Sequence, residues 1–283
     1  MSQSDTIGGA TFLAGAVNAP PRPSALRNVL AMAGVVVKEM YRRKDFYVLL
    51  IITIVITCLM GSVRFFHDDR IVRYLKENCL LLIWGASLAI AISTVARQLP
   101  AEKENRTIFP LLAKPVSRRQ VVMGKFLGCW IACGIALVCF YAFFGIICLT
   151  RERHWPLVTY FQAATLHWFA LAVVIAMALL GSLVFAAPSS NGTICIVVVI
   201  GILLVGRHLN QVALRLSEPL RSITYGIYYA MPHLEIFNAR DLVIHDWPPI
   251  GWKYFAIANA YALAYAGLLL GAACLIFRRK PLN

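Results

Sequence analysis

A long run without charged residues constrains this sequence most. Between Arg153 and Arg207 there is no Asp, Glu, Lys or Arg. The run is too long for one membrane crossing, because a helix crosses the hydrocarbon layer with about 20 apolar residues. The residues 187-APSSNG-192 favour a turn and divide the run into two spans. This feature predicts a membrane protein that crosses the bilayer several times.

Other apolar runs lie on both sides of this one. Only 14% of the 283 residues are charged, whereas a soluble domain carries roughly 25%, so a large soluble core is excluded. We predict an all-α integral membrane domain over residues 24–278 with six transmembrane helices. The spans are expected at about residues 46–63, 79–96, 123–149, 164–187, 191–207 and 253–277.

The positions of the basic residues predict the orientation. Cytoplasmic segments carry an excess of Lys and Arg next to the spans, and most basic residues fall in the cytoplasm if the N-terminus lies there. We therefore expect a multi-pass protein of the cytoplasmic (inner) membrane with both termini in the cytoplasm. Residues 1–23 are expected to form a disordered cytoplasmic leader. This topology accounts for the net charge of +14. We therefore expect no nucleic acid as a partner.

Residues 24–46, before the first span, have a helical repeat. Apolar residues recur at helical spacing, and basic residues take the other faces. The apolar residues are Leu26, Leu30, Ala33, Val37 and Met40. Two interpretations remain open. The segment is either an amphipathic interfacial helix on the inner leaflet or a cytoplasmic extension of the first span.

The densest group of charges lies between the second and third spans, over residues 97–125. Pro100 can begin a helix there, and Glu102 and Glu104 suit its positive end. Pro110 then stops or kinks the helix, which is too short to be stable alone in water. A plain basic loop explains the lysines and arginines of this connection but not its two acids. We interpret the connection as a docking element.

A second helix begins after this element. Ser117 and Gln120 have the spacing of a capping box, so the third span is expected to start below the membrane. Arg118 and Arg119 lie in its first turn, where a cation costs about 0.3–1 kcal/mol against the helix dipole. An anionic leaflet offsets this cost by about 1 kcal/mol per basic residue. We expect a helix cap and inner-leaflet anchor made of Pro115, Ser117, Arg118, Arg119 and Lys125.

The charged connection resembles that of the ABC-2 type transporter permease family. The pattern runs Glu-x-Glu-x-x-Thr, Leu-Leu, Pro-Val-Ser-Arg and Gly-Lys, and the resemblance extends over most of residues 24–278. Arg106 differs from the Gly of many members, and Pro110 interrupts a stretch that often stays helical. The matching residues are Glu102, Glu104, Thr107, Leu111, Leu112, Pro115, Val116, Ser117, Arg118, Gly124 and Lys125.

The resemblance implies the transmembrane permease subunit of an ATP-driven ABC exporter. In that family the connection after the second span carries a coupling helix, which docks into a separate ABC ATP-binding subunit. The implied partners are this subunit, a second permease copy in a homodimer or heterodimer, and membrane lipid. ATP and Mg are expected in the partner subunit and no cofactor in this chain. The docking residues implied are Glu102, Glu104, Arg106, Thr107 and Ile108.

The sequence contains no recognisable catalytic motif. A P-loop ending at Gly124 and Lys125 would need a glycine at position 119, which is Arg119. We therefore expect no catalytic residues, no bound metal and no enzyme activity in this chain. His154 and His167 are expected at the outer end of the fourth span. Several possible metal ligands in the external connection match no known spacing: His208, His233, Glu235, Asp241, His245 and Asp246.

The external connection, residues 207–252, is expected to hold short interfacial or re-entrant helices. They either close the exit of a pathway or only anchor the chain at the interface. The spans carry no charge, which suits an apolar or amphiphilic cargo or a pathway between two copies. The alternative function is a non-transporting membrane scaffold or assembly factor that docks a cytoplasmic partner. A membrane-embedded enzyme would need paired polar residues inside the spans, and we find none.

Overall fold

The computed structural model describes residues 25–42, 44–62, 69–104, 117–151, 156–185 and 187–279. These ranges are mostly helical and contain no strands, so the all-α prediction is confirmed for them. Five of the described helices are long and apolar enough to cross a membrane, and the chain is a multi-pass membrane protein. The five are α3 (Asp69–Glu104), α5 (Arg118–Arg151), α6 (Leu157–Val184), α7 (Pro188–Arg215) and α10 (Trp252–Arg279).

The first predicted span, residues 46–63, is not confirmed. Helix α2 (Lys44–Ser62) occupies this part of the chain, and Tyr47–Leu59 is its apolar section among the residues whose side chains are described. That described section alone is shorter than the roughly 20 residues of a crossing. Helix α2 packs against α3. Six spans therefore stay a prediction, and the predicted leader, residues 1–23, lies outside the described residues.

Helix α3 begins before the predicted start of the second span at residue 79. Arg73, Lys76 and Glu77 lie between the first two predicted spans, and charged residues are rare within spans. In the structure all three are helical, and Lys76 is 1% exposed. Its ammonium lies 2.9 Å from a carboxylate oxygen of Asp246, which compensates the buried charge. Lys76 lies in the stretch Val72–Gln98 of α3, which is long and apolar enough to cross a membrane, so the prediction of spans without charge is not confirmed there.

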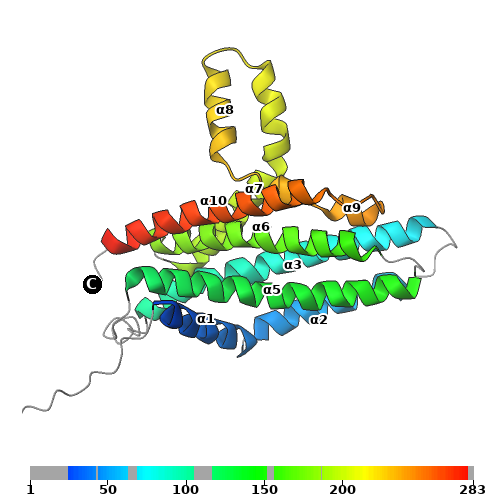
Figure 1. The fold of residues 1–283 in the computed structure, drawn as a ribbon, viewed down its shortest axis with the longest axis horizontal. Helices are drawn as coiled ribbons and strands as arrows, with labels where there is room; N and C mark the ends of the chain where they lie inside the picture. Colours follow the sequence, from blue (N-terminus) through cyan, green and yellow to red (C-terminus); the bar gives the residue numbers. More distant parts are fainter. Residues whose placement is uncertain are drawn as a thin grey trace, which may run out of the picture.

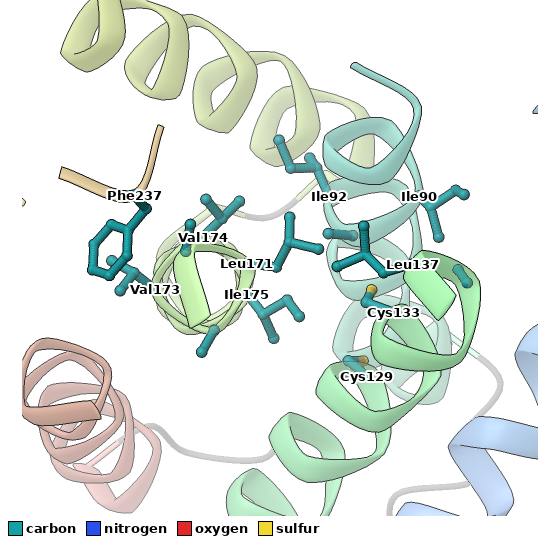
Figure 2. Close-up of a cluster of buried hydrophobic side chains, with 14 of the residues drawn as sticks. Ile90, Ile92, Cys129, Cys133, Leu137, Leu171, Val173, Val174, Ile175 and Phe237 are labelled. Atoms are coloured by element: carbon teal, nitrogen blue, oxygen red, sulfur yellow. The ribbon is translucent and has the colours of Figure 1, made fainter. Parts of the chain in front are cut away.

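Helix α6 is the centre of the bundle. Helices α3, α5 and α10 all pack against it. Figure 2 shows Leu171 and Ile175 on the side of α3 and α5, whereas Val173 and Val174 lie toward Phe237. All side chains of residues 170–176 are buried. A helix that is apolar on every side needs neighbours on every side, and this explains why the middle of α6, which belongs to the uncharged run, lies at the core.

Two tryptophans fasten α5 to α6. The indole N–H of Trp130 donates to the Trp168 carbonyl oxygen at 3.0 Å, and the indole N–H of Trp168 donates to the Trp130 carbonyl oxygen at 2.9 Å. The two rings stack with their centroids 4.4 Å apart. Gly134 permits this approach, because a Cβ there would lie 2.7 Å from the Trp168 indole nitrogen. A small residue of the third span therefore makes room for a ring.

A short turn joins α6 to α7. The sequence predicts a turn over residues 187–192, but α7 already begins at Pro188. Proline is favoured at the first helical position, since its missing N–H is not needed there. Asn191 consequently lies inside the helix, fully buried, and its side-chain amide donates to the Ala178 carbonyl oxygen at 3.0 Å. This bond holds the start of α7 against α6.

Helix α7 continues to Arg215, beyond the predicted end of the fifth span at residue 207. It pairs with α8 (Leu220–Ala230), and Figure 1 shows α8 beside another helical segment, both standing away from the bundle. A cavity of about 470 Å³ lies between α6, α7, α8 and α10, and its lining is almost entirely apolar. The chain returns to the bundle through η1 (Leu234–Phe237) and α9 (Arg240–Ile244). The predicted interfacial position of these short elements stays a prediction.

Candidate coupling site at the start of α5

Helix α1 (Ala25–Arg42) packs against the first turns of α5. The contact is close because Gly124 and Gly128, one turn apart, leave a smooth surface. A Cβ at Gly128 would lie 2.6 Å from the Val36 Cβ and 2.9 Å from the Ala33 carbonyl oxygen. Small residues at this spacing let helix backbones approach closely in membranes. The segment expected on the inner leaflet therefore has a protein partner along one face.

Only part of the predicted apolar face of α1 makes this contact. Ala33 and Met40 are buried, together with Val36, which the sequence pattern did not single out. Leu26 and Leu30 are 68% and 53% exposed. Helix α1 ends at Arg42 and α2 begins at Lys44; residue 43 lies outside the described residues, so both interpretations of residues 24–46 stay open. The exposed leucines leave room for the predicted contact with lipid, which stays a prediction.

The capping box predicted at Ser117 is present. The backbone N–H of Ser117 donates to the side-chain oxygen of Gln120 at 2.9 Å, and the N–H of Gln120 donates to the Ser117 hydroxyl at 3.3 Å. The pair satisfies two donors that a helix start leaves free. The start of α5 is therefore a defined boundary at the end of the charged connection.

Arg118 connects the start of α5 to the end of α10. Its guanidinium donates to the carbonyl oxygens of Phe277 at 2.8 Å and Arg278 at 3.3 Å, and lies 5.6 Å from the centre of the Phe277 ring. These carbonyls belong to the last turn of α10, where a helix carries partial negative charge. Since a cation is favoured there, the end of α10 offsets the cost of placing Arg118 in the first turn of α5. Its neighbour Arg119 is exposed.

Lys125 connects α5 to α3. Its side chain is 4% exposed, and its ammonium donates to the Gln98 carbonyl oxygen at 3.3 Å. We expected Lys125 to anchor the third span at the inner leaflet, but the contact in the structure is with protein. Helix α3 runs through Pro100 to Glu104, so Pro100 lies within a helix and does not begin one as predicted. Neighbouring helices can support a proline inside a membrane helix.

The predicted docking residues follow directly on these contacts. Glu102 and Glu104 lie in the last turn of α3, and their backbone alone is described. Arg106, Thr107, Ile108 and Pro115 lie outside the described residues, as does Pro110. The connection between Glu104 and Ser117 nevertheless has fixed ends, because the hydrogen bond from Lys125 to Gln98 holds α3 and α5 together. A force on this connection would act on both helices at once.

Substitution of Arg118 tests its link to α10. The Arg118→Ala variant is expected to lose about 1–2 kcal/mol of stability, because it removes a charge-assisted hydrogen bond to helix-end carbonyls. Arg118→Lys should lose less, since it keeps the charge. Heating purified protein in detergent and measuring the monodisperse fraction checks this. Arg119→Ala is the matched control and should behave like the parent; equal losses in Arg118→Ala and Arg119→Ala would contradict the assignment.

The histidines are distributed differently from the prediction. His154 lies outside the described residues. His167, expected at the end of the fourth span, is 2% exposed inside the bundle and lies 2.8 Å from the Ser87 hydroxyl. His245 stacks on Trp247 and His233 packs against Tyr228. Among the residues that the structure describes, no three His, Cys, Asp or Glu side chains are grouped as metal ligands.

The structure is a membrane bundle. At one end of it, three helices, α1, α3 and α10, contact the first turns of α5. The chain matches the family model described as ABC-2 family transporter protein over residues 24–282. It therefore belongs to the ABC-2 transporter family, as its charged connection predicts. No curated protein matches the chain. Members of the family are membrane transport subunits, so this chain is a membrane component of a transporter.

Proposed function

We propose that this chain is the permease subunit of an ATP-driven exporter in the cytoplasmic membrane. A separate ABC ATP-binding subunit docks on the connection between α3 and α5, through Glu102, Glu104, Arg106, Thr107 and Ile108. The family assignment supports the permease role, because ABC-2 permeases usually pair with such a subunit. Both termini and the docking connection lie in the cytoplasm, and substrate moves outward.

The observation that carries this proposal is the set of contacts around the start of α5. Arg118 binds the last carbonyls of α10, Lys125 binds a carbonyl of α3, and Gly128 packs on α1. A displacement of the connection therefore acts on α3 and α5 directly and on α1 and α10 through these contacts. Packed helices move as rigid elements, so one contact point outside the membrane is sufficient to move four helices.

A second permease copy completes the transport unit in our proposal. Gly267 and Gly271 lie on the exposed face of α10, and a Cβ at either would have no heavy atom within 4 Å. Small residues allow helices to pack closely in membranes, and α10 leaves both glycines uncovered. This face of α10 is the surface on which we place the second copy.

Co-expression with an ABC ATP-binding subunit tests the proposed function. The chain should co-purify with the subunit in detergent, and reconstitution in lipid should raise the ATP turnover of the subunit above that of the free subunit. Failure to co-purify would contradict the docking proposal. Stable co-purification with the same ATP turnover as the free subunit would favour the non-transporting scaffold.

A further inference from the structure

The segment 239–250, which we name the strap, lies at the end of the bundle far from the start of α5. It contains α9, which Figure 1 shows near the start of α3. The strap packs on α3 and α6, and Ala239, Val243 and Ile244 are buried. Its second half, residues 245–249, is exposed. The strap is therefore a surface segment held down by one apolar edge and by polar contacts at its ends.

The first polar contact is the ion pair between Lys76 of α3 and Asp246 of the strap. The Lys76 ammonium lies 2.9 and 3.1 Å from the two carboxylate oxygens of Asp246. The burial of the two partners is unequal, because Lys76 is 1% exposed and the Asp246 side chain is 54% exposed. The strap covers the lysine while its own carboxylate stays in reach of water.

The backbone of Asp246 is also strained. Its φ angle is 51°, in the left-handed region that non-glycine residues rarely occupy. Such a conformation costs of order 1 kcal/mol or more and persists where the surroundings enforce it. Aspartate tolerates the conformation better than most residues. Here the strained turn directs the carboxylate onto Lys76, and release of the ion pair would also release the strain.

Two further contacts fix the ends of the strap. At its start, the guanidinium of Arg240 lies 5.8 Å from the centre of the Trp84 ring on α3. At its end, the side-chain amide of Gln162 on α6 donates to the Ile250 carbonyl oxygen at 2.8 Å and accepts from the Ile250 N–H at 2.8 Å. Gln162 is 1% exposed. The strap thus connects α3 to α6. It contacts the Trp84 side chain on α3 and the Gln162 side chain on α6.

Two polar side chains, Ser87 and His167, lie behind the contact between Arg240 and Trp84. Trp84 stacks on His167, with ring centroids 5.5 Å apart, and the Nε2 atom of His167 lies 2.8 Å from the Ser87 hydroxyl. Ser87 and His167 are 1% and 2% exposed. The other ring nitrogen of His167, Nδ1, is buried without a hydrogen-bond partner among the described residues. A buried polar atom is costly without a hydrogen-bond partner, and a small polar molecule such as water can supply one.

We propose that the strap is a closure latched by Lys76 and Asp246, and that its release opens Ser87 and His167 to the transport pathway. This inference rests on the proposed function, because only a transporter has a transport pathway. The latch itself does not require an ATP-binding partner. When the strap lifts, Asp246 passes fully into water and Lys76 becomes accessible to water as well. Both charges are then solvated, so the open state leaves no charge stranded in the bundle.

A thiol introduced at position 87 reports on the strap. Purified Ser87→Cys protein in detergent is treated with a small cationic thiol reagent, and the modification of each cysteine is measured by mass spectrometry. Cys133, 1% exposed in the bundle, is the internal reference. Adding Lys76→Met should increase the labelling rate at position 87 about tenfold, because the ion pair no longer opposes local opening. Glu77→Gln, at an exposed neighbour, should leave the rate unchanged.

The outcome at Cys133 separates opening of the strap from unfolding. Unchanged labelling of the introduced thiol in the Lys76→Met variant overturns the proposal, and so does a parallel rise at Cys133, which would show that the pair stabilises the whole bundle. Asp246→Asn keeps the shape of the side chain and tolerates the left-handed turn. It should give at least as large a rise at position 87 as Lys76→Met, because it removes the carboxylate that compensates the buried Lys76 ammonium, with Cys133 again unchanged.

A second arm separates this proposal from the proposed function. An ABC ATP-binding subunit and ATP are added to the Ser87→Cys protein with its native strap, and labelling of the introduced thiol should rise. If Lys76→Met increases labelling but ATP does not, the strap is upheld and the coupling in the proposed function is contradicted. If ATP increases labelling but Lys76→Met does not, the coupling is upheld and the latch is contradicted.

Discussion

Replacing Gly128 with leucine is expected to leave little of the chain folded. A Cβ at this position would lie 2.6 Å from the Val36 Cβ and 3.0 Å from the Ala33 Cα, so the new side chain meets the backbone of α1. Backbone atoms of a packed helix cannot give way locally, and α1 would have to separate from α5. Overpacking of this kind costs about 1–3 kcal/mol for one added group and more for a full leucine side chain.

Gly85 provides the matched control for this substitution. It is exposed on another apolar helix, α3, and a Cβ there has no heavy atom within 4 Å. Gly85→Leu should therefore yield as much monodisperse protein as the parent after solubilisation, whereas Gly128→Leu should yield mostly aggregate. Gly128→Ala should fall between them. Equal yields for the two leucine variants would show that α1 does not pack on α5 as described.

Reversing both charges at Glu102 and Glu104 is expected to abolish docking. These residues end α3 and lead into the connection that we propose as the docking element. Two arginines there would add basic charge to a connection that is already basic and would remove its only acids. Like charges at a contact surface suppress association. The Glu102→Arg, Glu104→Arg variant should therefore fail to co-purify with an ABC ATP-binding subunit.

A charge reversal at the far end of the bundle controls for nonspecific effects. Glu77 is exposed, lies on the same helix α3, and belongs to no contact that we assign to docking. Glu77→Arg should co-purify with the ATP-binding subunit as the parent does. Retained docking in the double variant, or lost docking in the Glu77→Arg variant, contradicts the assignment of the docking surface. A folded monodisperse peak for both variants makes the comparison valid.

The predictions from sequence succeeded where local pattern determines structure. Long apolar runs identified five helices that are long enough to cross a membrane, because such runs are stable in lipid only as helices. The capping box of Ser117 and Gln120 formed as predicted, since its two hydrogen bonds join residues three positions apart. The motif between the second and third spans also identified the family correctly.

The sequence did not reveal contacts between residues far apart in the chain. Lys76 lies between two predicted spans, and its partner Asp246 is 170 positions away. Arg118 was expected at the inner leaflet, which stays a prediction, and its partner in the structure, the end of α10, is 159 positions away. Sequence spacing does not reveal such pairs. The same reason explains why the position of His167 was not predicted. Its polarity suggested the membrane interface, but in the structure it lies inside the bundle next to the Ser87 hydroxyl.

Cross-linking from the end of α3 tests the central claim most directly. A single added cysteine replaces Glu104 in one variant and Glu77 in another, at opposite ends of the same helix. Each variant is assembled with an ABC ATP-binding subunit and treated with a short thiol-to-amine cross-linker. We predict a product of permease and ATP-binding subunit from position 104 and none from position 77. A product from position 77 alone, or from neither position in an assembled complex, would contradict the account.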